Sequence, residues 1–419
     1  MSESALDKYL ERYAENEVIE IDLVEESYDY VLVIPICNEP FDCLKKIFSG
    51  ICQDEKVLVI LVVNSPDNSL KPEFQTNNTS FIESLVNQAQ NRYTLSEIAV
   101  FIQSYLLFDI VLINKNSQGN QIKTKQGVGM ARKIGCDLAV KYYRAGKIKA
   151  PWIFSTDADV VLPANYFEHM KQFKNNYSAI VLDFEHISND INLLDLQYYY
   201  DLKIRYYHAG LVYAGSDYDY IPLGSTLIAN LYSYIQVRGF PKKNAGEDFY
   251  LLNKLAKIKP IRYNKDNIKI KINSRLSDRV PFGTGPALLE ISALNNVNQY
   301  KYYHPHCFEL LKEWLQYLKH IWTPNGILMK PPKKQELSQL FEFFKLDSVL
   351  KKSKSQITSR ERWLQFIHQW FDAFKTLKAV HFFDKNHKRL NNKQLLNSDV
   401  FAKVRNPLLH ELIQKHEQI

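Results

Sequence analysis

The chain has 419 residues, of which 46% are hydrophobic, and a net charge of +7. This length is enough for a large core and two domains, and no run of about 18 apolar residues is present, which excludes a membrane-spanning helix. The acidic, polar N-terminus is unlike a signal peptide, and the five cysteines form no C-x-x-C pair, so we expect reduced thiols and a cytoplasmic protein.

The charge is unevenly distributed along the chain. Residues 321–419 hold 18 Lys and Arg against 9 Asp and Glu, so the positive surplus lies in the C-terminal part. Such an asymmetry can mark an anionic partner. Interspersed acids and the lack of nucleic-acid motifs argue against nucleic acid, whereas peripheral contact with a membrane stays possible.

The first elements predict an α/β fold. Residues 1–28 are expected to form a helical lead-in. Two apolar runs rich in β-branched residues, Tyr30–Ile36 and Val57–Val63, predict buried strands of parallel type. Apolar residues at helical spacing lie between them, from Phe41 to Ile51, so strand, helix and strand form a βαβ unit.

The next segments continue this pattern. Leu70 to Tyr105 is polar and is predicted to be a partly helical insertion, because a structureless loop of that length is rare. Phe108–Ile113 predicts a third strand, Gly127–Tyr143 a helix with one apolar face, and Trp152–Phe154 a short strand.

The second half changes character. A helix is expected from Pro163, and strands at Ala179–Phe184 and Asn267–Ile272. From about Tyr300 only helical patterns occur, and aromatic residues at helical spacing, from Trp363 to Phe374, predict a helical core more than a membrane face. We therefore expect a catalytic domain over residues 29–299 and a helical domain over residues 300–419.

Two carboxylates follow the strand that begins at Trp152. Asp157 and Asp159 are separated by one residue. Carboxylates past a buried strand are costly to leave unpaired, and Mg²⁺ or Mn²⁺ would satisfy them while keeping sites open for phosphate oxygens. The alternative is structural, with Asp157 capping the strand end and Asp159 solvated. The carboxyl edge of an α/β sheet is nevertheless where ligands usually bind.

Four short motifs occur in a fixed order. The first strand ends in IPICNEP, a helix opens with GVGMARKIG, the next strand ends in TDAD, and the turn RGFPKKNAGED enters a helix. Over about Tyr30 to Ile258 this order resembles the family 2 glycosyltransferases of the GT-A fold. The resemblance implies a Rossmann-like, mostly parallel sheet flanked by helices; the all-α C-terminal region has no counterpart in it.

The resemblance also implies a reaction and roles for four acids. A hexose would pass from a nucleotide-sugar to an acceptor hydroxyl, with inversion and with a divalent cation on the diphosphate. Asp159 would hold the metal, Asp157 would contact the ribose or the metal, and Asp248 would be the base beside Glu247. The alternative for this last pair is helix capping. The helix dipole lowers a carboxylate's pKa, so we expect Asp248 to be ionised at neutral pH.

The nucleoside would lie at the ends of the first two strands. Pro35, Asn38 and Glu39 match the family's nucleoside-binding strand end, although a turn that starts a helix is the structural alternative. The second strand ends at Asn64, where the family usually has an Asp that pairs with a pyrimidine base. An amide can donate as well as accept, so uridine as the donor base is in doubt.

Further cations are candidates for donor binding. Lys125 and Arg132 match cations that approach the base, ribose or diphosphate, with a solvated charge at a helix end as the alternative. Lys133 stands where the family usually has Asn. Arg275 and Arg279 lie in a Gly/Pro-rich segment and could clamp the diphosphate bidentately, or lie solvated in a surface loop.

Two other functions compete with a glycosyltransferase. A sugar-phosphate nucleotidylyltransferase uses a related sheet, but it would need a Gly-rich, basic phosphate loop after the first strand, where CNEP stands instead. A non-catalytic protein could bind an anionic partner through the basic C-terminal helices. The sequence names neither the sugar nor the acceptor.

Overall fold

The structure is a computed structural model, and it describes residues 3–51, 55–67, 72–104, 108–173, 176–277, 281, 283–323, 326–327, 330–353 and 357–417. The chain forms two compact units. The first contains the residues up to Asn189 together with Pro222–Ser274, and the second contains Asp190–Ile221 and the residues from Gly283 onward. The domain boundaries expected at residues 29 and 300 stay predictions.

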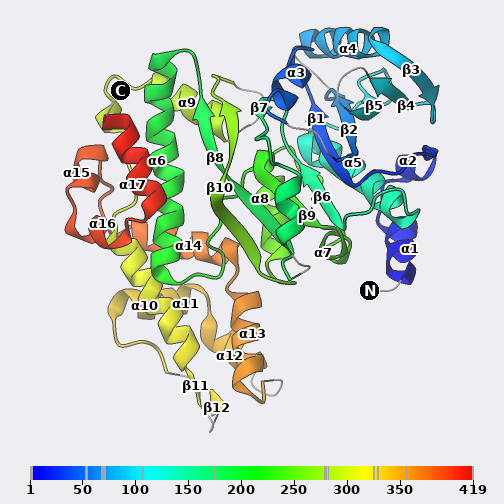
Figure 1. Cartoon of the computed structure of the whole chain (residues 1–419). Helices are drawn as coiled ribbons and strands as arrows, with labels where there is room; N and C mark the ends of the chain where they lie inside the picture. Colours follow the sequence, from blue (N-terminus) through cyan, green and yellow to red (C-terminus); the bar gives the residue numbers. More distant parts are fainter. Residues whose placement is uncertain are drawn as a thin grey trace. The chain divides into compact units, whose positions relative to one another are not determined.

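The first unit is built on one ten-stranded sheet with the order β3-β4-β5-β2-β1-β6-β9-β8-β10-β7 (Figure 1). The strands β5, β2, β1 and β6 are parallel, β9 is antiparallel to both of its neighbours, and β8 is parallel to β10. The bounds are β1 (Tyr30–Ile36), β2 (Val57–Asn64), β3 (Ala89–Thr94), β4 (Ala99–Ser104), β5 (Asp109–Lys115), β6 (Trp152–Ser155), β7 (Val160–Val161), β8 (Ala179–Ile187), β9 (Leu227–Asn230) and β10 (Ile261–Asn273). The predicted mostly parallel sheet is confirmed.

The central strands form where the sequence is continuously apolar. Every residue of β1 and β2 is buried, as parallel strands covered on both faces require. Helix α5 (Gly127–Arg144) packs on both strands, and a Cβ at Gly135 would lie 2.4 Å from Val33 Cγ1, so the helix approaches the sheet closely. The other helical elements of this unit are α1 (Glu3–Arg12), α2 (Asn16–Ile19), α3 (Cys43–Phe48), α4 (Pro72–Asn87), α7 (Leu231–Gln236), α8 (Glu247–Leu255) and the short 3₁₀ helices η1 (Glu168–Gln172) and η2 (Gly224–Thr226).

Two predicted segments differ from the structure. The expected insertion at 70–105 contains α4 but also the antiparallel strands β3 and β4, which extend the sheet. Strand β3 is polar and almost entirely exposed, so it lacks the apolar alternation that predicts a strand. The helix expected from Pro163 is a turn followed by the 3₁₀ helix η1.

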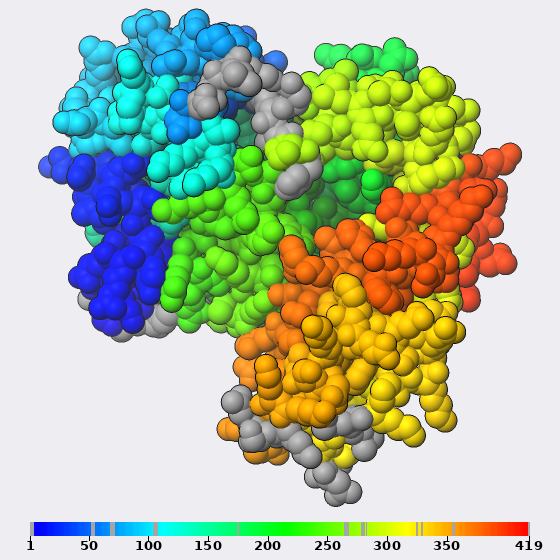
Figure 2. Space-filling model, turned by 180° about the vertical axis from the view of Figure 1, so that it is seen from behind, coloured from blue at the N-terminus to red at the C-terminus, as the bar shows by residue number. Residues whose placement is uncertain are grey.

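A buried polar network holds the N-terminal helices on α5. Asp137 accepts hydrogen bonds from the hydroxyls of Tyr9 and Tyr234, at 2.5 and 3.0 Å, and from the backbone N–H of Glu15 at 3.0 Å. Lys133 Nζ donates to Asp137 at 2.8 Å. Figure 2 shows the N-terminal residues, in dark blue, against residues coloured cyan, in line with the contact between α1 and α5. Lys133 therefore faces the N-terminal helices.

Replacing Lys133 by Met should lower the free energy of unfolding by about 3–5 kcal/mol at neutral pH, because it leaves the Asp137 charge buried without its cation. Burial already raises the pKa of Asp137, with Lys133 opposing the rise. The loss should therefore be smaller at pH 5 than at pH 8, and urea unfolding at both values measures it. Lys149→Met, in an exposed ion pair with Asp29, is the control and should cost about 1 kcal/mol or less. Equal losses in the two variants would contradict the role of Lys133.

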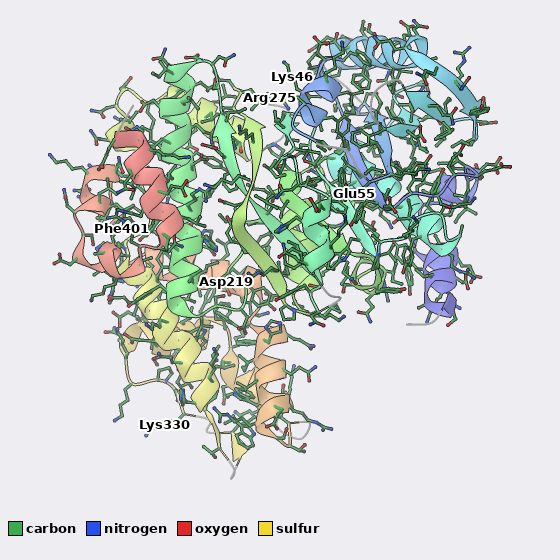
Figure 3. The ribbon with its side chains drawn as sticks, in the orientation of Figure 1. Lys46, Glu55, Asp219, Arg275, Lys330 and Phe401 are labelled. Atoms are coloured by element: carbon green, nitrogen blue, oxygen red, sulfur yellow. The ribbon has the colours of Figure 1, made fainter. Side chains whose placement is uncertain are left out.

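The second unit is helical, with α6 (Ile191–Ala214) in contact with α9, α10, α16 and α17. Phe401 of α16, labelled in Figure 3, packs with its ring 5.5 Å from that of Tyr206 of α6. The remaining elements are α9 (Thr284–Ser292), η3 (Val297–Gln299), α10 (His306–His320), β11 (Trp322–Thr323), β12 (Gly326–Ile327), α11 (Gln335–Phe343), α12 (Leu346–Ser353), α13 (Arg360–Trp370), α14 (Ala373–Asp384), α15 (Asn392–Leu396), α16 (Asp399–Val404) and α17 (Pro407–Glu417). Together with the sheet of the first unit, this helical C-terminal region confirms the predicted fold class.

The predicted aromatic stripe is divided between two helices. Trp363 and Ile367 of α13 are buried in the core of this unit. Phe374 belongs to the next helix, α14, because α13 ends at Trp370. Within the described ranges, no helix is both long and apolar enough to cross a membrane.

Candidate active site

The sheet has a switch point at β1. From β1 the chain continues to β2 on one side, and it returns later to β6 on the other side. Pairing of β1 with β6 stops at Val33 and Ser155, whereas Pro35 is still paired with Val62 of β2. Pro35 therefore lies past the end of β6, where its missing N–H interrupts no ladder. Ligands of open α/β sheets bind at the carboxyl ends of strands at such a point.

Arg132 of α5 lies at the centre of the candidate site and is 1% exposed. Its Nε donates to Glu247 Oε1 at 3.1 Å, and its two terminal nitrogens donate to Ser155 Oγ at 2.6 Å and to Asp157 Oδ1 at 2.5 Å. One terminal nitrogen also reaches the Thr156 carbonyl at 3.4 Å. The guanidinium thus joins the end of β6 to the start of α8, so the TDAD and GED motifs lie together.

Two glycines permit this arrangement by close approach. The N–H of Gly129 donates to the Lys243 carbonyl at 2.9 Å, and a Cβ at Gly129 would lie 2.4 Å from the Pro241 carbonyl oxygen. The first turn of α5 can therefore contact the turn that leads into α8. A Cβ at Gly224 would lie 2.4 Å from a terminal nitrogen of Arg132, so the guanidinium needs a glycine there as well.

The carboxylates around Arg132 outnumber the cation. Burial raises the pKa of Glu247, although Arg132 opposes the rise. Burial would lower the pKa of Arg132, but Asp157 and Glu247 raise it above its usual range. Asp248 is half-buried, and its burial and the neighbouring Glu247 carboxylate raise its pKa to about 7.

The prediction that Asp248 has a lowered pKa is wrong. Asp248 does lie in the first turn of α8, and Oδ1 accepts a hydrogen bond from the Phe249 N–H at 2.6 Å, which favours ionisation. A helix N-terminus contributes only about 0.3–1 kcal/mol at most sites. Loss of water and the like charge of Glu247 exceed that effect.

Asp157 and Asp159 lie in the loop between β6 (Trp152–Ser155) and β7 (Val160–Val161). The Asp157 side chain is 37% exposed and uses only Oδ1 on Arg132. The Asp159 carbonyl accepts hydrogen bonds from the N–H and the side chain of Asn273, at 2.8 and 2.9 Å, which ties this loop to the end of β10. The described residues contain no group of three His, Cys, Asp or Glu that could hold a metal. Two carboxylates do suit a hard cation that takes its other oxygens from phosphate and water.

An amide network lies at the ends of β1 and β2. Asn78 of α4 accepts from the Asn38 N–H at 2.8 Å and donates to the Asn64 carbonyl at 2.8 Å and to Asn116 Oδ1 at 3.1 Å. Asn38 has φ = 56°, a left-handed conformation that asparagine tolerates. The sequence did not single out Asn78 and Asn116, because each lies in a polar stretch where asparagine is common.

Asn64 uses both of its amide hydrogens inside the protein. Its Nδ2 donates to the carbonyls of Ile36, at 3.0 Å, and Val62, at 3.3 Å. The carboxamide oxygen is therefore the atom left for a ligand, and it can only accept. The sequence put uridine in doubt because an amide can donate to the base. Both Asn64 N–H groups instead donate to backbone carbonyls at the strand ends, so neither is left to donate to a base.

The structure does not bring every predicted residue to this cluster. Glu39 is buried after β1, and Lys125 is exposed in the loop before α5, without an ion pair in the described residues. Arg275, labelled in Figure 3, follows β10 and belongs to the second unit. Arg279 lies outside the described residues. The donor-binding roles of these four residues stay predictions, as do the roles of the residues that the structure brings together.

Comparisons with known proteins give only distant similarity. No protein-family model matches the sequence, and no curated protein matches it. The structure is similar to S. aureus TarS 1-349 in complex with UDP-GlcNAc, with 12% identity, a TM-score of 0.32, and coverage of 92% of this chain and 88% of that one. It is also similar to the mannosyltransferase PcManGT from Pyrobaculum calidifontis in complex with GDP-Man and Mn²⁺, with 12% identity, a TM-score of 0.34, and coverage of 86% and 93%.

A third similar structure is GalNAc-T7 with UDP, GalNAc and Mn²⁺, at 12% identity and a TM-score of 0.33. This chain covers 59% of GalNAc-T7, and 81% of this chain is matched. Because all three TM-scores are near 0.3, we infer a function from the residues of the site instead.

Proposed function

We propose that this chain transfers a hexose from a nucleotide-sugar to an acceptor hydroxyl, with a divalent cation, Mg²⁺ or Mn²⁺, and with inversion. One observation carries the proposal. Buried Arg132 bonds both to Asp157 of the TDAD motif and to Glu247 of the GED motif, at the carboxyl ends of the strands. Two motifs that lie 90 residues apart in the sequence thus meet at one place. If these acids only capped a helix and a strand, the two motifs would have no reason to lie together.

The donor would lie across the ends of β1, β2 and β6. The Asn64 oxygen would accept from an imide N–H of the base, as in uracil, and the left-handed turn at Asn38 would border the nucleoside. Asp157 and Asp159 would hold the cation against the diphosphate. A cation bound there would neutralise the charge that develops on the departing nucleoside diphosphate.

The two acids of the GED motif would have different roles. Glu247 is 5% exposed and bound to Arg132, so it would position the guanidinium. Asp248 is the more accessible of the two, and its pKa of about 7 is close to the optimum for a base at neutral pH. Asp248 would therefore take the proton of the acceptor hydroxyl as that oxygen attacks the sugar.

The metal site is testable through nucleotide binding. With Mn²⁺ present, a nucleoside diphosphate at 100 times its Kd should stabilise the wild type by about 2.7 kcal/mol. Asp159→Asn should remove this metal-dependent gain and leave the ligand-free melting temperature within a few degrees of wild type. Thermal shift with UDP, GDP, ADP and dTDP, each with and without Mn²⁺, measures both.

Asp347→Asn, in an exposed ion pair of α12, is the control and should behave like the wild type. A full metal-dependent shift in Asp159→Asn would remove the central claim. Stabilisation by nucleoside triphosphates with sugar phosphate, and release of pyrophosphate, would instead identify a nucleotidylyltransferase. No shift with any nucleotide would favour the non-catalytic alternative.

A further inference from the structure

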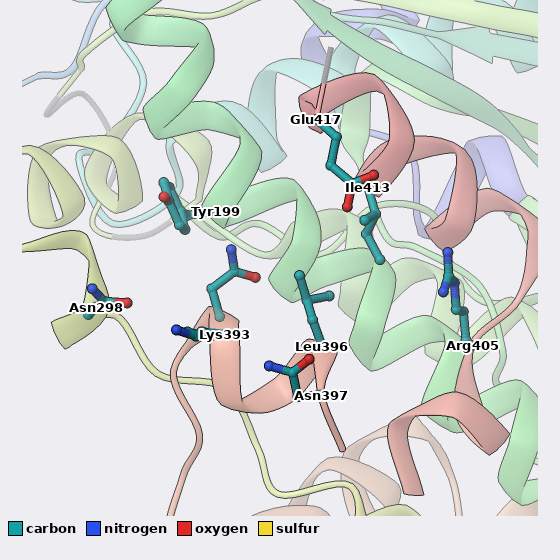
Figure 4. A pocket seen from close by; sticks show the side chains of 9 residues that line it. Tyr199, Asn298, Lys393, Leu396, Asn397, Arg405, Ile413 and Glu417 are labelled. Atoms are coloured by element: carbon teal, nitrogen blue, oxygen red, sulfur yellow. The ribbon is translucent and has the colours of Figure 1, made fainter. Parts of the chain in front are cut away.

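Two polar features lie outside the Arg132 cluster. One is a pocket of about 420 Å³ in the helical unit. Figure 4 shows the charged ends of Lys393 and Arg405 on opposite sides of its lining, so a single anion would not contact both. The other is the network of asparagine amides at the ends of β1 and β2, which lies at the edge where the donor nucleoside is proposed to bind.

Asn78 of α4 is the centre of this network. It is fully buried, and every hydrogen-bonding atom of its carboxamide has a partner. Oδ1 accepts from the Asn38 N–H at 2.8 Å, and Nδ2 donates to the Asn64 carbonyl at 2.8 Å and to Asn116 Oδ1 at 3.1 Å. These three partners lie at the ends of β1, β2 and β5, which are neighbours in the sheet. One side chain of α4 therefore connects three strand ends.

The orientation of the Asn78 carboxamide is determined by its partners. A backbone N–H only donates and a carbonyl only accepts, so Oδ1 faces Asn38 and Nδ2 faces Asn64. The amide of Asn116 is oriented in the same way, because its Nδ2 donates to the Gln75 carbonyl at 3.1 Å. Position 78 therefore needs one acceptor and two donor hydrogens, which asparagine has and an ionised aspartate lacks.

The network also holds the turn after β1. Asn38 has φ = 56°, in the left-handed region that is unfavourable for residues other than glycine, although asparagine tolerates it better than most. Such a conformation persists where the surrounding structure determines it, and it occurs often at ligand-binding sites. Asn78 binds the Asn38 N–H, and the neighbouring Asn77 donates to the Asn38 side-chain oxygen at 2.7 Å. The shape of this turn thus depends on α4.

The same edge carries the atom that is proposed to contact the base. Asn64 Nδ2 donates to the carbonyls of Ile36 and Val62, so the Asn64 oxygen is the group left to accept. Uracil, thymine and guanine each have a ring N–H that can donate to it. Cytosine and adenine have a bare ring nitrogen at the equivalent position, which would repel the oxygen.

We propose that Asn78 is a positioning residue for base selection. It holds the Asn38 turn and the Asn64 strand end so that the base meets the Asn64 oxygen, and the chain then selects nucleotides whose base has a ring N–H. This inference rests on the proposed function, because it assumes that a nucleotide-sugar binds at this edge.

Calorimetry on the full chain with Mn²⁺ and nucleoside diphosphates tests the selection. UDP and CDP have rings of the same size, as do GDP and ADP, so the ratio of affinities within each pair isolates the ring N–H. The wild type should prefer UDP to CDP, or GDP to ADP, by about tenfold or more, because one hydrogen bond replaces one repulsion. The first preference indicates a pyrimidine site and the second a purine site, and dTDP tests whether thymine fits as well.

Variants of Asn78 test the positioning. Asn78→Asp and Asn78→Ser should each weaken the preferred nucleotide about tenfold or more and reduce the preference to about threefold or less. A partly unfolded variant would lose affinity for both nucleotides of a pair by the same factor, because the competent fraction enters both Kd values. The ratio is therefore independent of folding. Asn87→Ser, at an exposed asparagine that ends α4, is the control and should keep both affinity and preference.

The inference and the proposed function can fail separately. Equal affinities within both pairs, with metal-dependent binding intact, would overturn the inference and leave the proposed function standing. So would Asn78 variants with wild-type affinity and preference, or variants that lose affinity but keep the preference, since the second result shows a purely structural role. A wild type that binds no nucleotide would remove the proposed function and the inference with it.

Discussion

Replacing Asp248 by Asn should lower turnover by about a hundredfold or more while donor and metal affinity stay within a few-fold of wild type. Asparagine keeps the shape of the side chain but cannot take a proton from the acceptor hydroxyl. In the proposed function the donor and the metal bind to groups on the other strand ends, so both affinities should be nearly unaffected. Steady-state kinetics with metal and nucleotide titrations separate the two effects.

Glu247→Gln is the companion variant. It keeps an acceptor oxygen for Arg132 and should lower turnover less than Asp248→Asn does. If Glu247→Gln abolishes turnover and Asp248→Asn does not, the assignment within the pair is reversed. If neither variant matters and the product keeps the donor's anomeric configuration, the base hypothesis fails altogether.

The raised pKa of Asp248 adds a pH dependence with a definite sign. A base must be ionised, so turnover should rise with pH up to about 7 and then level off. Stability has the opposite trend, because the folded state holds the Asp248 proton more tightly than the unfolded chain does. The contribution of Asp248 to the free energy of unfolding is fully present below the pKa that its carboxyl has in the unfolded chain. That contribution is lost as the pH rises through about 7.

Urea unfolding of the metal-free protein tests this second trend. Between pH 5 and pH 8 the wild type should lose about 2 kcal/mol that Asp248→Asn retains. A stability difference between the two proteins that does not grow over this range would contradict the raised pKa.

The sheet was predictable because its central strands are buried on both faces. Such strands are continuous apolar runs, as in β1 and β2, and the sequence shows them directly. Strand β3, AQNRYT, is nearly all exposed, and pairing with β4 determines its conformation. Helix α6 carries so many tyrosines that the helical spacing of its apolar residues cannot be seen in the sequence. Packing within the second unit stabilises this helix.

For the candidate site, the order and spacing of the motifs predicted which residues are candidates, but they did not predict which of these residues contact one another. Asp157 and Glu247 are 90 positions apart, and only the tertiary structure shows that one guanidinium contacts both. Desolvation depends on the same packing, so the dipole argument predicted the wrong direction for the net pKa shift of Asp248. Both amide hydrogens of Asn64 are bonded to backbone carbonyls, those of Ile36 and Val62. A sequence motif describes side chains, so it could not predict these two hydrogen bonds.

Replacing Arg132 by Met should lower the free energy of unfolding by about 3–5 kcal/mol at pH 8, because Glu247 would be buried without its cation. The loss should be smaller at pH 5, since the pKa of Glu247 is already raised and a proton can replace the lost cation. Urea unfolding at both pH values measures this. A loss that does not depend on pH would indicate a packing effect instead.

A double variant separates stability from function. Arg132→Met with Glu247→Met removes the buried pair together, and Asp157 remains solvated because its side chain is 37% exposed. Most of the lost stability should return, since a buried ion pair is often no more stable than a well-packed apolar one. Turnover should stay at least about a hundredfold below wild type, because the guanidinium no longer joins the end of β6 to the start of α8 and a misplaced catalytic group can cost that much. A stable double variant with wild-type turnover would show that Arg132 serves the fold alone.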